Sequence, residues 1–158
     1  MQKLVTLNRL KKIIKKERDK KIIVFTNGCF DILHPGHIKI LKFAKSKGDI
    51  LIVGLNSDRS IKKIKGKNRP ILNQKARSYL LSAISFVDYI VIFDEKTPLQ
   101  LIKSLKPDYL VKGEDWKKVD IVGKEYVKKV FRVKHYPGYS TTNIIKTILK
   151  KTINGKNL

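Results

Sequence analysis

Cysteine, acidic residues and long apolar runs are all scarce in this chain of 158 residues. Its single cysteine, Cys29, excludes an intramolecular disulfide and a zinc site rich in cysteine. No apolar run approaches the ~18 residues that a membrane-spanning helix needs, and lysine and arginine interrupt the N-terminal segment. We therefore expect a cytoplasmic protein without a signal peptide, long enough to bury a hydrophobic core in one domain.

The shortage of acidic residues gives the chain a formal net charge of +23, from 36 Lys and Arg against 13 Asp and Glu. Such an excess suggests nucleic acid or an anionic membrane surface as a partner. Only six of the basic residues are arginines, however, and many lysines together with many isoleucines are typical of A/T-rich coding bias. DNA-reading surfaces favour arginine, and base-stacking surfaces need a repeating basic and aromatic pattern that this sequence lacks. We therefore expect small polyanionic substrates, with no nucleic acid and no membrane as partner.

Short runs of β-branched and aromatic residues alternate with longer amphipathic segments. The runs predict buried strands at residues 22–26, 50–55, 89–93, 109–111 and 130–135. The amphipathic segments predict helices at residues 6–16, 36–47, 74–84, 97–105 and 143–151. The lysine-rich stretch 57–72 is expected to be a long polar connection. This order predicts an α/β fold, with a Rossmann-like, parallel five-stranded sheet that has helices on both faces. One domain is expected over residues 1–150, followed by a frayed tail over residues 151–158.

Two histidines lie three positions apart after the first predicted strand. His34 and His37 flank Pro35-Gly36 at the start of a predicted helix. Gly36 lets the backbone approach a ligand closely, and a helix N-terminus offers free N–H groups and the positive end of the helix dipole to an anion. A lone histidine there is more often structural, but this pair favours a phosphate site. Zinc is the less favoured alternative, because Cys29 and His135 are the only further soft ligands.

His34-Pro35-Gly36-His37 resembles the His-x-Gly-His motif of the nucleotidyltransferase superfamily, and Ser140-Thr141-Thr142 resembles that superfamily's second signature. Nearly the whole chain resembles the adenylyltransferase domain of bifunctional heptose kinase/adenylyltransferases, without the kinase half. The matching segments include residues 25–37, 53–58, 87–98 and 105–113. The resemblance implies a nucleotidyltransferase fold and the transfer of AMP from ATP to D-glycero-β-D-manno-heptose 1-phosphate, giving ADP-heptose and pyrophosphate. It also implies Mg²⁺ and a homo-oligomer.

One segment departs from the heptose enzymes. Where they more often have Gly-Gly-Asp-Tyr, this chain has Gly113-Glu114-Asp115-Trp116, which is similar to the Gly-Asp-Asp-Trp of glycerol-phosphate cytidylyltransferases. Glycerol 3-phosphate with CTP, and FMN with ATP as in archaeal FAD synthases, are therefore alternatives, and a basic nucleic-acid-binding protein is a more distant one. The form Asn27-Gly28-Cys29-Phe30-Asp31 favours the heptose branch, because the cytidylyltransferases usually have Gly-Thr-Phe-Asp.

The resemblance implies roles for individual residues. We expect His37 at the phosphate groups around the α-phosphorus and His34 toward the β- and γ-phosphates. Lys65 is the expected phosphate-reaching lysine, with Lys45 as the alternative. The expected nucleotide-binding residues are Thr26, Asn27, Gly28, Cys29, Phe30, Asp31, Gly36, Ser140, Thr141 and Thr142, with Asp115 and Trp116 at the ribose and base. Cys29 is expected to be a small packed side chain rather than a nucleophile.

Two residues keep more than one interpretation as substrate ligands. Asp31 is expected to orient the sugar phosphate, to hold a water of Mg²⁺, or only to brace its loop. Arg77 resembles a substrate-phosphate arginine of the superfamily, and an ordinary place on a helix surface would explain it equally well. No set of protein ligands for a resident metal ion is expected.

Overall fold

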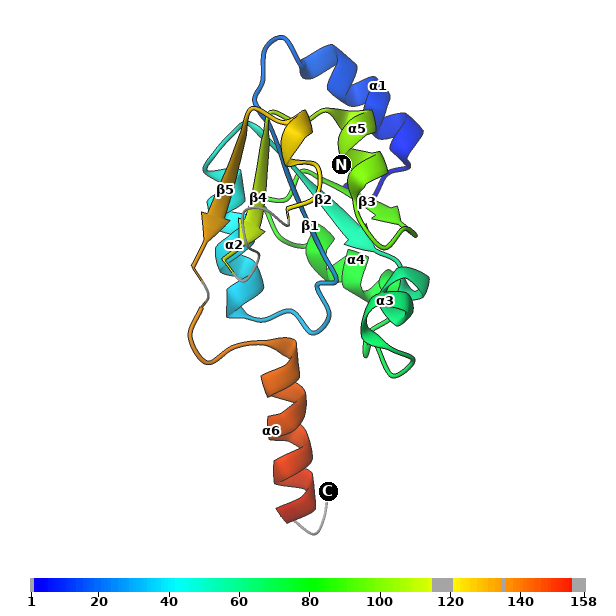
Figure 1. Ribbon diagram of the computed structural model, residues 1–158, viewed down its shortest axis with the longest axis vertical. Coiled ribbons are helices and arrows are strands. Elements are labelled where there is room, and N and C mark those ends of the chain that lie inside the picture. The colour runs from blue at the N-terminus through cyan, green and yellow to red at the C-terminus, as the bar shows by residue number, and fades with distance from the viewer. Residues whose placement is uncertain (1, 115–120, 135, 155–158) are drawn as a thin grey trace.

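The computed structural model describes residues 2–114, 121–134 and 136–154. In chain order the elements are α1 (Leu7–Glu17), β1 (Ile23–Gly28), α2 (Pro35–Lys45), β2 (Ile50–Asn56), α3 (Asp58–Lys65), α4 (Gln74–Ser82), β3 (Tyr89–Phe93), α5 (Leu99–Leu105), β4 (Tyr109–Gly113), the 3₁₀ turn η2 (Lys124–Tyr126), β5 (Lys129–Val133) and α6 (Thr141–Asn154). The strands form one sheet, all parallel, in the order β3-β2-β1-β4-β5 (Figure 1). The prediction of a parallel five-stranded sheet is confirmed.

The order of the strands reverses at β1. From β1 the chain moves outward to β2 and β3, and it then returns to the other side of β1 for β4 and β5. Val24 of β1 accordingly pairs with Leu51 of β2 on one side and with Tyr109 of β4 on the other. Sheets of this kind bind ligands at the carboxyl ends of the strands beside such a reversal. The topology therefore directs attention to the segments that follow β1 and β4.

Two apolar layers cover the sheet, one on each face. Phe25 and Ile52 belong to the layer that α1 and α5 complete, whereas Val24 and Leu51 belong to the layer that α2 and α4 complete. All seven residues of β2 are buried, as a strand covered on both faces requires. The prediction of helices on both faces is thus confirmed.

The stretch 57–72, expected to be a loop, contains helix α3. The Ser57 hydroxyl accepts a hydrogen bond from the Ser60 N–H at 3.1 Å and so caps the helix. Within the helix, Ile61 is fully buried. Most of its other residues are exposed and basic, which is why the sequence predicted a polar connection. The start of α5 is a smaller correction, because the helix predicted over residues 97–105 begins at Leu99.

Helix α6 extends away from the sheet and its covering helices (Figure 1). It reaches Asn154, so residues 151–154 of the expected tail are helical, and residues 155–158 lie outside the described part of the chain. Its later side chains Ile148, Leu149 and Ile153 are exposed. Among the described residues, no helix is long and apolar enough to cross a membrane.

Candidate active site

A cavity of about 260 Å³ opens at the carboxyl ends of β1 and β4. Its walls come from the loop after β1, the first turn of α2, the end of α3, the end of β4 and the start of α6. The cavity is lined by Thr26, Asn27, Gly28, Cys29, Phe30, Asp31, His34, Gly36, His37, Ile40, Lys65, Lys112, Gly113, Lys134, Tyr136, Tyr139, Ser140, Thr141 and Thr142. The two sequence signatures, distant in the chain, therefore meet in one cavity.

The loop after β1 has an unusual backbone that its neighbours hold in place. Phe30 and Ile32 adopt left-handed conformations, with φ of 46° and 52°, and such conformations cost free energy in residues other than glycine. The carboxylate of Asp31, only 1% exposed, accepts hydrogen bonds from the N–H groups of Ile71 and Leu72, each at 2.9 Å, and from Arg69 Nε at 3.0 Å. Of the three interpretations of Asp31, these contacts match the bracing of its loop.

The two histidines lie against one another at the start of α2. His34 occupies the N-cap position without a side-chain capping bond, and the rings of His34 and His37 stack with centroids 3.8 Å apart. A Cβ on Gly36 would lie 3.0 Å from the His34 ring, so this stack leaves room for no side chain there. The geometry is that of a helix N-terminus that presents two imidazoles to one cavity.

Both imidazoles are neutral at pH 7. Burial lowers the pKa of His34, and burial, helped by His34 and Lys65, lowers the pKa of His37 to about 3. The Nδ1 atoms of both rings are buried and have no hydrogen-bond partner among the described residues. Buried polar atoms without hydrogen-bond partners cost free energy. A ligand that forms hydrogen bonds with these two nitrogens would remove that cost.

Lysines supply the positive charge of the cavity. Lys65 lines the cavity from the end of α3. Lys45 is not among the lining residues and forms an ion pair with Asp88, with 2.6 Å between Nζ and Oδ2. Lys112 and Lys134 also line it and were not expected. Lys112 is 8% exposed and donates a hydrogen bond to Asn27 Oδ1. A lysine inside the otherwise apolar strand 109–113 was the available signal, because a buried lysine needs a compensating role.

Arg77 is not among the residues that line the cavity. It is fully buried and donates hydrogen bonds to the carbonyl oxygens of Cys29 at 2.6 Å and Leu72 at 2.9 Å, and to the carboxylate of Asp58 at 2.8 Å. Neither the substrate-phosphate position nor the helix-surface position describes it. Arg77 instead ties the loop after β1 to the N-termini of α3 and α4.

The start of α6 forms another wall of the cavity. The Thr141 hydroxyl donates to the carbonyl oxygen of Asp31 at 2.7 Å, and the Ser140 hydroxyl accepts from the Asn143 N–H at 3.1 Å. Ser140 thus has a capping role while it lines the cavity. Three residues named from the sequence, Asp115, Trp116 and His135, lie outside the described part of the chain.

Two further kinds of chemistry, a nucleophilic thiol and a metal site, find no support among the described residues. Burial raises the pKa of the Cys29 thiol, so the thiol stays protonated, which fits a packed side chain. Within residues 2–114, 121–134 and 136–154, no group of three or more His, Cys, Asp or Glu side chains is arranged to hold a metal ion.

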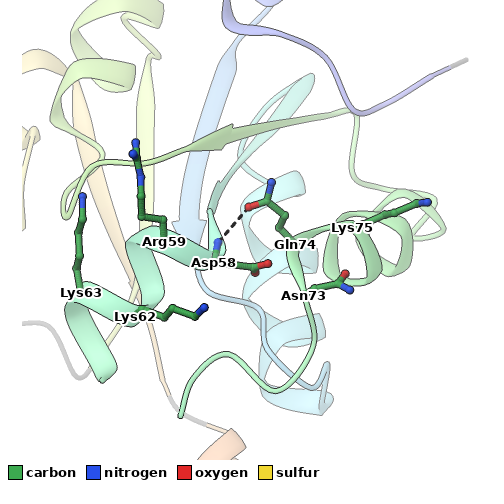
Figure 2. A pocket seen from close by; sticks show the side chains of 7 residues that line it. All are labelled: Asp58, Arg59, Lys62, Lys63, Asn73, Gln74 and Lys75. Carbon is green, nitrogen blue, oxygen red and sulfur yellow. Dashed lines mark hydrogen bonds between the residues drawn. The ribbon is translucent and has the colours of Figure 1, made fainter. Parts of the chain in front are cut away.

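A larger hollow, of about 850 Å³, lies between α3 and the start of α4 (Figure 2). Several of its polar groups already have partners: Arg59 pairs with Asp94 at 2.9 Å, and the Asp58 N–H donates to Gln74 Oε1 at 3.1 Å. Figure 2 shows the side chains of Lys63 and Lys75 pointing in different directions rather than toward one point. We therefore assign the functional site to the smaller cavity.

The strand order and the phosphate-ready cavity define a nucleotide-binding α/β domain of the nucleotidyltransferase type. Comparison with protein families agrees, because the cytidylyltransferase-like family model matches residues 25–147. The chain belongs to the cytidylyltransferase-like family.

Within this family, the chain is similar to one part of the bifunctional protein HldE. The chain is 54% identical over 147 residues to the bifunctional protein HldE of Campylobacter fetus subsp. fetus, a match that covers 93% of this chain and 31% of that protein. HldE of Helicobacter pylori strain Shi470 is 51% identical over 152 residues, covering 96% of this chain and 32% of the relative. The chain thus spans about a third of the length of these relatives, and the expected resemblance to one part of a bifunctional enzyme is confirmed.

A solved structure supports the same fold. The lipopolysaccharide core biosynthesis protein from Thermoplasma volcanium is 34% identical with a TM-score of 0.60, over 73% of this chain and 98% of that one. The pantoate-beta-alanine ligase from Francisella tularensis covers all of this chain with a TM-score of 0.66, over 82% of its own length. Its identity of 20% shows a common fold only.

Proposed function

We propose that this domain transfers AMP from ATP to D-glycero-β-D-manno-heptose 1-phosphate, giving ADP-heptose and pyrophosphate. The observation that carries the proposal is the meeting of His34, His37 and Thr141 in one cavity at the reversal of the sheet. The identity of 54% to HldE supports the choice of this branch, since the sequence resembles the adenylyltransferase domain of heptose kinase/adenylyltransferases.

The reaction is an in-line substitution at the α-phosphorus of ATP. A phosphate oxygen of the sugar phosphate forms the new P–O bond, and the bond between the α-phosphorus and the oxygen bridging to the β-phosphate breaks. The nucleophile is already an anion, so the reaction needs no strong general base. Asp31, whose carboxylate is bound to residues 69–72, is accordingly not needed as one. Catalysis then consists of positioning the reactants and stabilising the charge that moves to pyrophosphate.

The residues of the cavity suit these two tasks. His37 would donate a hydrogen bond near the α-phosphorus and His34 toward the β- and γ-phosphates. An approaching phosphate raises the pKa of both imidazoles, because negative charge favours their protonated form. Lys65, Lys112 and Lys134 would offset the charge of the triphosphate and the sugar phosphate.

The backbone and the start of α6 would complete the nucleotide site. The N–H groups of Gly28, Cys29 and Phe30 would meet phosphate oxygens, and the hydroxyls of Ser140 to Thr142 would bind the β- and γ-phosphates at the N-terminus of α6. Asp115 and Trp116 follow β4 in the sequence and would bind the ribose and base.

Mg²⁺ would enter with the nucleotide. Among the described residues the cavity offers no cluster of carboxylates to hold the ion, and the carboxylate of Asp31 is occupied. Mg²⁺ commonly keeps several waters and binds through phosphate oxygens. The substrate is thus the complex of Mg²⁺ with ATP, and the protein contributes cations and donors around it.

Pyrophosphate release tests the proposed reaction. The purified chain is incubated with Mg²⁺, ATP and heptose 1-phosphate, with fructose and glycerol phosphates as control acceptors. We expect release with ATP and the heptose phosphate at least tenfold faster than with any control acceptor. The resemblance of residues 113–116 to glycerol-phosphate cytidylyltransferases makes CTP with glycerol 3-phosphate the main rival pair, and FMN with ATP the second. If either rival pair reacted faster, that pair would be the substrates in place of ATP and the heptose phosphate. If no pair released pyrophosphate, the proposal that the chain is a nucleotidyltransferase would be refuted.

A further inference from the structure

The outer part of α6 has an apolar face that the described part of the chain leaves uncovered. Ile148 and Leu149 are each 55% exposed and Ile153 is 78% exposed. At 3.6 residues per turn, these three lie on the same half of the helix as Ile144 and Ile145. An isolated helix of about this length is only marginally stable in water. A surface that covers the apolar half would therefore stabilise α6.

The lysines of α6 lie at the margins of this apolar half and opposite it. Lys146 and Lys151 lie at the two margins of the apolar half, and Lys150 lies on the opposite side. No acidic residue follows Glu125 in the sequence, whereas eight basic residues do: Lys128, Lys129, Arg132, Lys134, Lys146, Lys150, Lys151 and Lys156. The covering surface should therefore be anionic and apolar at once.

A second copy of this chain matches that description less well. It would bring the same lysines to both margins of the contact, with no carboxylate from α6 to pair with them. A face of five aliphatic side chains is also smaller than the ~800 Å² per partner of a standard stable interface. A flat lipid surface sets no such minimum area and supplies the negative charge.

We propose that α6 binds reversibly to the surface of an anionic lipid bilayer. Its aliphatic half enters the boundary between headgroups and acyl chains, and its lysines reach the lipid phosphates. The binding needs no spanning helix, and it would add a membrane partner that the sequence analysis, which assigned the lysine excess to coding bias, did not expect. Thr141 lines the cavity at the other end of this helix, so the bilayer would also steady one wall of the nucleotide site.

Co-sedimentation with vesicles tests this proposal on the full chain. Vesicles of phosphatidylglycerol and phosphatidylethanolamine are compared with vesicles of phosphatidylcholine at physiological salt, without ATP or sugar phosphate. We expect binding to the anionic vesicles only. The double variant Ile148→Gln, Leu149→Gln should lower the partition coefficient at least about tenfold, because two aliphatic side chains leave the boundary. The matched control, Asn143→Gln, Thr147→Gln, changes two residues of the polar half and should stay within about twofold.

Three outcomes would overturn the proposal. Equal binding to both kinds of vesicle would remove the role of charge. Binding unchanged by the double variant would assign the attraction to lysines elsewhere on the domain. Absence of vesicle binding would refute the proposal. If analytical ultracentrifugation then showed a dimer of the unchanged chain and a monomer of the double variant, the apolar face would be assigned to a second copy. Circular dichroism and thermal unfolding show whether each variant is folded. Since no substrate is present, the result is independent of the proposed reaction.

Discussion

The cavity wall that carries His34 and His37 and the wall formed by the start of α6 are held in place differently. Behind the first, the carboxylate of Asp31 accepts three hydrogen bonds and the guanidinium of Arg77 donates three, and both side chains are buried. At the second, Thr141 bonds to the Asp31 carbonyl, and the side chains beyond the first turns of α6 are exposed.

This difference matches the proposed work of the two walls. In the proposed reaction the histidine wall would face the reacting phosphorus, where preorganised donors give the largest catalytic benefit. Its buried bonds hold two left-handed residues, Phe30 and Ile32, in place. The α6 wall would hold the β- and γ-phosphates, which leave as pyrophosphate, and a less firmly held wall suits release of that product. We therefore expect changes behind the first wall to affect folding or the rate constant, and changes at the second to affect nucleotide affinity.

The largest expected effect comes from removing the buried arginine. Arg77→Met keeps much of the apolar volume but leaves the carboxylate of Asp58 and the carbonyl oxygens of Cys29 and Leu72 without their donor. Each buried acceptor left without a donor costs about 1–3 kcal/mol, whereas the carboxylate of Asp58, 31% exposed, can still meet water, so we expect a loss of about 2–5 kcal/mol. Urea unfolding followed by circular dichroism should show a loss of this size.

The matched control is an exposed arginine in the same region. Arg59 pairs with Asp94 on the surface, with its side chain 68% exposed, and such pairs contribute little. Arg59→Met should change the free energy of unfolding by less than about 1 kcal/mol. Similar losses in the two variants would show that the buried bonds do not brace the first wall.

His37→Ala should act on catalysis and spare the fold. Loss of one preorganised donor typically lowers kcat by about 10²- to 10³-fold, so we expect a fall of at least about 10²-fold in pyrophosphate release. Urea unfolding measured at pH 7.5 should stay near that of the unchanged chain. An effect confined to KM would mean that His37 binds substrate and transition state equally, which contradicts the assigned role.

The same histidine should make the fold sensitive to acid. In the folded chain the pKa of His37 is about 3, whereas in the unfolded chain it is about 6.5. Below pH 6.5 the unfolded chain therefore takes up a proton that the folded chain refuses, so stability falls as the pH falls. Linkage gives a loss of about 2 kcal/mol between pH 7.5 and pH 5. Urea unfolding at the two pH values measures it, and His37→Gln should remove most of the difference. An equal difference in that variant would assign the sensitivity to other groups.

Much of the sheet could be predicted from the sequence, for a physical reason. Buried parallel strands are covered on both faces, so runs such as 50–55 are apolar throughout and easy to see. The helix at 58–65 was missed because Ile61 is its single buried apolar side chain and most of its other residues are polar or basic. A short helix with one side on the core leaves too weak a periodic pattern for detection.

The histidine and threonine positions could be predicted because local chemistry determines them: each lies at a helix start that follows a strand. The place of Arg77 could not. Its three partners come from Cys29, Asp58 and Leu72, which only the folded topology brings around one guanidinium. Lys112 was missed for a similar reason, since its burial beside Asn27 depends on the pairing of β4 with β1.

The smallest expected effect concerns the α6 wall. Thr141→Val keeps the shape of the side chain and removes the hydroxyl, whose single proton is donated to the Asp31 carbonyl and would turn to a phosphate oxygen when ATP binds. We expect ATP affinity, measured by isothermal titration calorimetry, to fall about tenfold, the size of one lost hydrogen bond to a charged group, with little change in urea unfolding. Thr147→Val is the matched control, because its hydroxyl bonds only within the helix, to Asn143 O at 2.9 Å, among the contacts of the described residues. If Thr141→Val instead destabilised the fold while ATP affinity held, the α6 wall would be a structural support like the first wall, and the contrast between the two walls would disappear.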